Sequence, residues 1–218
     1  MKPAELYLLA YNGLQVAGWA LILVKTLSGL AEGLSWSQLY TNVECLVQIF
    51  QTAAVLEIVH CAIGLVRSPI ATTIIQVFSR VSVVWPVLYK VHEARDSIGV
   101  PMLLVAWSIT EVIRYSFYAL NIVKSVPSFL VWCRYTFFII LYPMGASGEL
   151  FTVVRSLNEV HAKKHFSLEM PNAINWSFSF WWYLVLFALT YIPGFPKMYL
   201  HMFGQRKKVL NDAHKKQN

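Results

Sequence analysis

The chain has 218 residues, of which 57% are hydrophobic and only 13% are charged, and its formal net charge is +7. Soluble domains carry about a quarter charged residues, so this composition argues against a soluble globular domain and predicts an integral membrane protein. The basic residues gather at 155–165 and 206–216, beside apolar segments, where they favour contact with the cytosol or with anionic head groups over nucleic-acid binding.

Six segments are long and apolar enough to cross a bilayer, which takes about 20 residues. The first, Leu6 to Val24, follows Lys2 and Pro3 directly and lacks a small-residue cleavage pattern, so we expect a permanent span and not a removable signal peptide. The others are, in chain order, about Val43 to Val66, Pro69 to Tyr89, Ile98 to Val123, Val126 to Leu150 and Trp176 to Met198. The sequence therefore predicts an all-α bundle of six transmembrane helices, with residues 1–218 as a single domain.

The second to fifth segments carry ionisable and amide side chains at membrane depth. Such groups are costly in lipid, so they usually face the interior of the bundle, where they pair or mark a functional site. Three pairs are spaced three or four residues apart and should share a helix face: Glu57 with His60, Gln76 with Arg80, and Glu111 with Arg114. Each pair alone is also compatible with a purely structural role in fixing helix register, whereas the whole set favours a functional interior.

The fifth segment, VPSFLVWCRYTFFIILYPMGASGEL, has Arg134 in its first half and Tyr142 and Glu149 near its end. A phenol and a carboxylate in an apolar helix predict proton-transfer chemistry. Seven residues are about two helical turns, or roughly 10 Å of rise, so the two groups need a bent helix or long side chains to act on neighbouring atoms. We expect Pro143 and Gly145 to bend or unwind the helix for this purpose, although a proline kink without catalytic purpose has the same sequence.

Residues 60–68, HCAIGLVRS, match the His-Cys-x5-Arg-Ser signature of cysteine phosphatases. In those enzymes a loop between a strand and a helix surrounds the phosphate. Here Cys61 lies in an apolar helical segment without a preceding strand, so we do not expect phosphatase activity. Together with Cys45 and Cys133 it makes an odd, unclustered set of cysteines, which predicts neither a disulfide framework nor a metal site.

Longer stretches carry a family resemblance. They are WSITEVIRYSFYAL and VWCRYTFFIILYPMGASGE, with QTAAVLEIVHCAIGLVRSP upstream and MPNAINWSFSF and PGFPKMYLHMFGQRKK downstream. Over nearly its whole length the chain resembles the very-long-chain (3R)-3-hydroxyacyl-CoA dehydratases, also called protein tyrosine phosphatase-like proteins, and looks closest to the plant PASTICCINO branch. The resemblance implies a hydro-lyase that converts a (3R)-3-hydroxyacyl-CoA to a trans-2-enoyl-CoA, the third step of fatty-acid elongation, without a cofactor or metal.

The family's catalytic residues are a Tyr and a Glu in a Leu-Tyr-Pro-x-Gly-x-x-x-Glu pattern, which falls on residues 141–149 without departure. The resemblance therefore implies Tyr142 and Glu149 as the catalytic pair, and which of them is base and which is acid stays open. Supporting or substrate-positioning roles are expected for the polar groups at membrane depth and one glycine: Arg134, Arg114, Glu111, Arg80, Gln76, Glu57 and Gly145. Arg134 or Arg114 is the candidate cation for polarising the thioester carbonyl.

The resemblance also implies the endoplasmic reticulum membrane, and the other elongation enzymes as partners: the condensing enzyme, the 3-ketoacyl-CoA reductase and the enoyl-CoA reductase. Lys215 and Lys216 resemble a dilysine retrieval signal, which would place the C-terminus in the cytosol, although a solvated basic tail has the same composition. Six spans then put residues 155–165 in the lumen, against the positive-inside rule. The alternative function is a non-catalytic scaffold of the elongation complex or a phosphoprotein-binding antiphosphatase. A transporter is not favoured, because no repeated arrangement is present.

Overall fold

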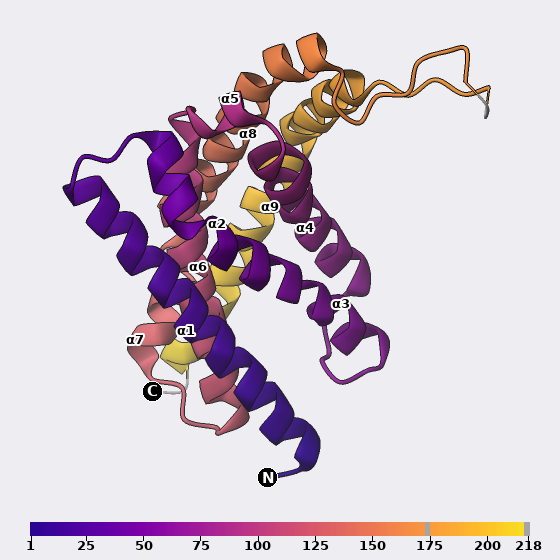
Figure 1. Cartoon of the computed structure of the whole chain (residues 1–218). Coiled ribbons are helices and arrows are strands. Elements are labelled where there is room, and N and C mark those ends of the chain that lie inside the picture. Colours follow the sequence, from indigo (N-terminus) through magenta and orange to yellow (C-terminus); the bar gives the residue numbers. More distant parts are fainter. Residues whose placement is uncertain (173–174, 216–218) are drawn as a thin grey trace.

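The computed structural model describes residues 1–172 and 175–215, with side chains in the last segment described up to residue 209. Lys216, half of the predicted dilysine signal, therefore lies outside the described residues. All regular elements in the described part are helical, which confirms the predicted all-α class (Figure 1). They are α1 (Pro3–Ala31), α2 (Trp36–Ala53), α3 (Val55–Ala62), α4 (Ile70–Val83), the π-helix η1 (Val84–Tyr89), α5 (His92–Arg95), α6 (Gly99–Ile122), α7 (Ser128–Arg134), α8 (Phe138–Lys163) and α9 (Phe180–Lys215).

Four helical stretches are long and apolar enough to cross a membrane: Pro3–Ala31, Trp36–Ala62, Ile70–Tyr89 and Gly99–Ile122. The pair Ser128–Arg134 and Phe138–Lys163, bent by 40° at its junction, adds a fifth if it forms one span. Of the six predicted spans, four are therefore confirmed, or five if this pair forms one span. The sixth predicted segment lies mostly in α9, whose many Trp and Tyr residues, two prolines and basic end make it less apolar than the others.

α6 lies in the middle of the bundle, where it packs against α1 and α8, and α9 packs against α8 (Figure 1). The core between these helices is large and aromatic, with Trp19 of α1 and Trp107 of α6 almost completely buried. Many leucines and phenylalanines on the outer faces stay exposed on the isolated chain, as expected where lipid covers a helix. The arrangement places α8 between two partners, α6 and α9, that contribute to the site described below.

Two glycines allow α6 and α8 to approach closely. A Cβ atom on Gly99 would lie 2.3 Å from the carbonyl oxygen of Gly148, and one on Gly148 would lie 2.8 Å from the backbone nitrogen of Leu103. Neither position accepts a side chain unless the backbones separate. Small residues at helix crossings are typical of membrane bundles, where helices associate by close packing. The crossing also fixes how far Glu149, the next residue of α8, lies from α6.

The predicted unwinding at Pro143 and Gly145 is wrong, because α8 runs without interruption from Phe138 to Lys163. The chain breaks earlier, in a turn at residues 135–137 between α7 and α8. Pro143 has no N–H with which to bond the carbonyl of Ile139, four residues earlier. The hydroxyl of Tyr199 on α9 donates to that carbonyl oxygen at 3.0 Å. A neighbouring helix thus supplies the donor that proline lacks, which is how transmembrane helices tolerate proline.

The start of α1 and the last described turns of α9 lie at the same end of the bundle, near α7 and the start of α8 (Figure 1). α5 and the connection between α8 and α9 lie toward the opposite end (Figure 1). Because Tyr142 is only one turn into α8, it lies toward the end of the bundle where α1 begins, and Glu149 lies deeper in the bundle.

Candidate active site

Tyr142 lies on the face of α8 that packs against α9. Its ring stacks on Phe195 and Tyr199, with centroid distances of 5.1 and 5.9 Å and interplanar angles of 23° and 9°. The side chain is half-buried, and its hydroxyl makes no hydrogen bond to any described residue. Stacking therefore fixes the ring, while the hydroxyl keeps its hydrogen-bonding capacity for a substrate.

Glu149 follows Tyr142 by seven residues, so both project from the same face of the helix. It is buried, with 8% of its surface exposed. Its Oε1 accepts a hydrogen bond from Nε1 of Trp107 on α6 at 2.9 Å, and its Oε2 accepts one from the hydroxyl of Tyr191 on α9. Both oxygens act as acceptors, which is the pattern of an ionised carboxylate.

No hydrogen bond joins Tyr142 to Glu149 in the described part of the chain. Because α8 is continuous between them, their Cα atoms are separated by about two turns, roughly 10 Å along the axis. The two groups therefore line one face of a continuous helix, and their side chains must close this separation to act on neighbouring atoms of one substrate. A substrate lying along this face, between α8 and α9, would meet both.

α9 carries aromatic residues at every fourth position: Tyr183, Phe187, Tyr191, Phe195, Tyr199 and Phe203. Where neighbouring rings contact, their centroids are 5.0 to 6.2 Å apart. We call this set the α9 stripe. The three tyrosine hydroxyls reach Ser82, Glu149 and the Ile139 carbonyl in turn. Sequence analysis missed Tyr191 and Tyr199, because the four-residue period predicts a row of aromatic rings and does not show which hydroxyls are used.

Four of the predicted supporting residues form one buried network. Glu111, whose side chain is 2% exposed, accepts hydrogen bonds from Arg80 and Arg114. Arg114 also pairs with both oxygens of Glu57, at 2.8 and 2.9 Å, and the Tyr115 hydroxyl donates to Glu57. The network joins α3, α4 and α6, and it confirms the predicted pairing of Glu111 with Arg114.

Trp107 connects this network to Glu149. Its ring lies 5.6 Å from the guanidinium carbon of Arg80, a cation–π arrangement, while its N–H donates to the carboxylate of Glu149. Gly145 lies beside the same ring, since a Cβ atom there would be 3.9 Å from Cδ1 of Trp107. Because Gly145 is small, α8 packs closely against the indole of Trp107, which also donates a hydrogen bond to Glu149 of the same helix.

Two predicted supporting residues stand apart from this network. Gln76 is exposed on α4, although Arg80 one turn later points inward. Arg134 lies over the rings of Phe117 and Tyr118, at 4.5 and 4.8 Å, and donates to the Tyr118 hydroxyl at 3.3 Å. Among the described residues Arg134 has no carboxylate partner, and it makes no hydrogen bond or ion pair with Tyr142 or Glu149.

The phosphatase-like segment has the geometry of a helix end. Cys61 is in the last turn of α3, with the Thr73 hydroxyl 3.8 Å from its sulfur, and Arg67 is exposed in the turn that follows. His60 hydrogen-bonds to the Tyr7 hydroxyl at 2.9 Å and not to Glu57, with which it shares a helix face. The strand, loop and helix that hold a phosphate in cysteine phosphatases are not formed here.

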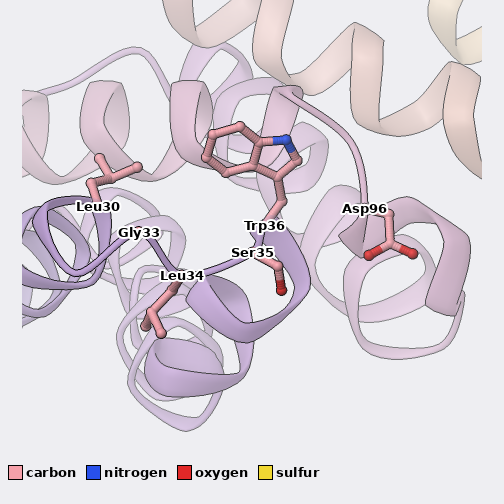
Figure 2. A pocket seen from close by; sticks show the side chains of 6 residues that line it. All are labelled: Leu30, Gly33, Leu34, Ser35, Trp36 and Asp96. Atoms are coloured by element: carbon pink, nitrogen blue, oxygen red, sulfur yellow. The ribbon is translucent and has the colours of Figure 1, made fainter.

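Figure 2 shows a surface hollow at the α1–α2 connection, lined by Leu30, Gly33, Leu34, Ser35, Trp36 and Asp96. It lies where α1 ends and just before α6 begins, away from Tyr142 at the start of α8. Its lining contains no base and acid pair comparable to Tyr142 and Glu149. We therefore place the candidate active site along the face of α8 that meets α9.

Comparison with known proteins identifies the family to which the chain is similar. The family model described as "Protein tyrosine phosphatase-like protein, PTPLA" matches residues 51–212. The very-long-chain (3R)-3-hydroxyacyl-CoA dehydratase hpo-8 of Caenorhabditis elegans is 61% identical, over 97% of this chain and 98% of its own length. The human very-long-chain (3R)-3-hydroxyacyl-CoA dehydratase 2 is 44% identical, over 98% of this chain and 85% of its own.

The dehydratase PASTICCINO 2 of Arabidopsis thaliana is 40% identical, over 96% of this chain and 95% of its own length. The nematode and human proteins are therefore more similar to this chain than the plant protein is. No solved structure matches the chain.

Proposed function

Because the chain belongs to the protein tyrosine phosphatase-like (PTPLA) family, we infer that it dehydrates very-long-chain (3R)-3-hydroxyacyl-CoA to trans-2-enoyl-CoA. It is a hydro-lyase of fatty-acid elongation, as the names of its relatives indicate. The observation that carries the proposed mechanism is the placement of a tyrosine with an available hydroxyl and a buried carboxylate on one face of one membrane helix. A non-catalytic scaffold would have no need of this pair.

The reaction requires a base that removes a proton from C2 and an acid that protonates the hydroxyl leaving C3. We assign the base to Glu149, since a carboxylate that only accepts hydrogen bonds is ready to take a proton. We assign the acid to Tyr142, whose hydroxyl has a proton to donate and no partner among the described residues. The C2–H and C3–O bonds break, the C2=C3 bond forms, and water leaves. Return of the proton from Glu149 to Tyr142 restores the enzyme.

Negative charge develops on the thioester oxygen as the C2 proton leaves, and a nearby cation stabilises it. Of the two arginines considered for this role, Arg114 is engaged by Glu57 and Glu111, whereas Arg134 faces only aromatic rings and a hydroxyl. We therefore propose Arg134, at the break between α7 and α8, as the group that meets the thioester or an adjoining anionic part of CoA.

We further propose that α9 forms the sixth crossing in the endoplasmic reticulum membrane and that both termini face the cytosol. The start of α1 and the described end of α9 lie at the same end of the bundle, which supports an even number of crossings (Figure 1). The condensing enzyme and the two reductases of elongation are the proposed partners. The arrangement predicts that a C-terminal tag is digested by protease outside intact microsomes, while a glycosylation site inserted near residue 170 is modified. Protection of the tag would contradict it.

The test of the function is formation of a long-chain enoyl-CoA by the purified protein. Wild type should be active. The dehydration rates of Tyr142→Phe and Glu149→Gln should be lower by about a hundredfold or more, which is the contribution expected of a general acid or base. Cys61→Ser and Tyr89→Phe serve as folded controls that alter neither group. An inactive wild type, or Tyr142→Phe and Glu149→Gln variants as active as the controls, would contradict the proposal.

A further inference from the structure

The carbonyl of Ile139 is the one backbone acceptor of α8 that Pro143 leaves without its helical donor. Ile139 and Pro143 bracket Tyr142, so this open position lies in the turn that carries the proposed acid. An unpaired carbonyl in a membrane bundle is costly and tends to find another donor or distort the helix. How this carbonyl is satisfied therefore bears directly on the position of the Tyr142 ring.

Tyr199 contacts this turn in two ways. Its hydroxyl donates to the Ile139 carbonyl at 3.0 Å. Its ring lies nearly parallel to the Tyr142 ring, at 9° and a centroid distance of 5.9 Å, and rests on Phe203 and Phe195 of the α9 stripe. One side chain of α9 thus holds both the backbone and the side chain of the turn in which Tyr142 lies.

We propose that Tyr199 is a positioning residue that fixes Tyr142 for proton donation, acting through the Ile139 carbonyl that Pro143 leaves open. This inference rests on the proposed function of Tyr142. It gives Pro143 a purpose other than the bend expected from the sequence, since the proline creates an acceptor on α8 to which α9 is attached. Loss of the Tyr199 hydroxyl leaves the carbonyl unpaired and lets the Tyr142 turn move.

The experiment is a double-mutant cycle on the purified full chain, with kcat and KM measured for a long-chain 3-hydroxyacyl-CoA. Tyr199→Phe keeps the ring and removes the hydroxyl, and it should lower kcat about tenfold or more with little change in KM, because misplacement of a reacting group is costly in rate. Pro143→Ala restores an N–H that can bond the Ile139 carbonyl within the helix. In that background Tyr199→Phe should lower kcat less than about threefold.

The matched control is Tyr183→Phe. Tyr183 belongs to the same stripe and stacks on Phe187, but its hydroxyl meets Ser82 at 3.4 Å and no backbone carbonyl of α8. The Tyr183→Phe change should leave kcat within about twofold of wild type, because it removes a hydroxyl without freeing a carbonyl beside Tyr142. This comparison decides the inference if Pro143→Ala does not fold.

The outcomes separate the inference from the function on which it rests. An inactive wild type overturns the proposed function. An active wild type with Tyr199→Phe no more impaired than Tyr183→Phe overturns the positioning role alone. Equal losses from Tyr199→Phe with and without Pro143 overturn the route through the Ile139 carbonyl. A loss in kcat confined to the background that contains Pro143 supports the inference.

Discussion

Glu149 receives hydrogen bonds from two helices, and each donor is a single atom that can be removed. Trp107→Phe removes the indole N–H, and Tyr191→Phe removes the phenol that reaches the other oxygen. We expect each to lower kcat about tenfold, because a loosely held carboxylate meets the C2 proton less often in the right geometry. The kcat of the double variant should fall by less than the product of the two single-variant factors, since both donors act on one group.

Trp85→Phe is the matched control for the tryptophan change. Trp85 also donates a hydrogen bond from its ring nitrogen, but to the Thr52 hydroxyl at 2.9 Å and not to Glu149. The turnover of the Trp85→Phe variant should equal that of wild type. Normal turnover in Trp107→Phe and Tyr191→Phe would show that Glu149 does not need its donors.

Single residues differ in how well the sequence predicts them. Arg80, Glu111, Arg114 and Glu57 were predictable as inward-facing, because a charge at membrane depth must find a partner. Trp107 and Tyr191 were not, since an aromatic residue in an apolar span gives no sign that its polar atom is used. Gln76 was misplaced because its amide can stay exposed on α4 while Arg80 turns inward.

At the level of the helix, the α6–α8 crossing sets the position of the site. A Cβ on Gly148 would lie 2.8 Å from the Leu103 nitrogen and 2.9 Å from the Gly99 oxygen, both backbone atoms. Gly148→Ala should therefore push the helices apart, at a cost of about 1–3 kcal/mol in stability, and lower kcat by lengthening the Trp107–Glu149 hydrogen bond. Thermal unfolding and turnover of the purified variant check both effects.

Gly13→Ala is the control for the helix crossing. Gly13 is also inside a helix, α1, but a Cβ there would meet nothing within 4 Å. Alanine is the better helix former, so this variant should be as stable as wild type or slightly more stable. If Gly148→Ala behaves in the same way, the close crossing does not hold the site together.

The structure of α8 could be predicted only in part. Its length, polar residues and shared face for Tyr142 and Glu149 followed from spacing, but the helix is not unwound at Pro143 as expected. A proline breaks a helix when its lost hydrogen bond has no substitute, and here Tyr199, 56 residues later in the chain, provides one. Such long-range compensation is not visible in local sequence.

Across the whole molecule, the network of Arg80, Glu111, Arg114 and Glu57 ties three helices together. Glu111 is its centre, with two arginines on one buried carboxylate. Glu111→Gln should destabilise the protein by about 3–5 kcal/mol, because it leaves arginines buried without their counter-charge. Chemical or thermal unfolding in detergent measures the loss.

The contrasting variant is Glu169→Gln, which removes a carboxylate from a surface pair. Glu169 bonds Lys164 in the connection before α9, and its side chain is 64% exposed. Exposed ion pairs contribute little, so its unfolding midpoint should stay close to that of wild type. Equal stability of the two variants would mean that the buried network does not stabilise the fold.

The whole fold was predictable as an all-α membrane bundle, because apolar length and low charge determine that class. The number of crossings was less certain, because α9 combines an aromatic stripe with two prolines and a basic end. Its function depends on the face it presents to α8, and that face is set by tertiary packing.

The most direct test of the proposed chemistry is exchange of the C2 hydrogen of a long-chain 3-hydroxyacyl-CoA with deuterium oxide. If Glu149 is the base and Tyr142 the acid, Glu149→Gln should lose exchange together with dehydration. Tyr142→Phe should still exchange the C2 hydrogen while losing dehydration, since proton removal does not need the acid. Loss of exchange in Tyr142→Phe with retention in Glu149→Gln would contradict the account.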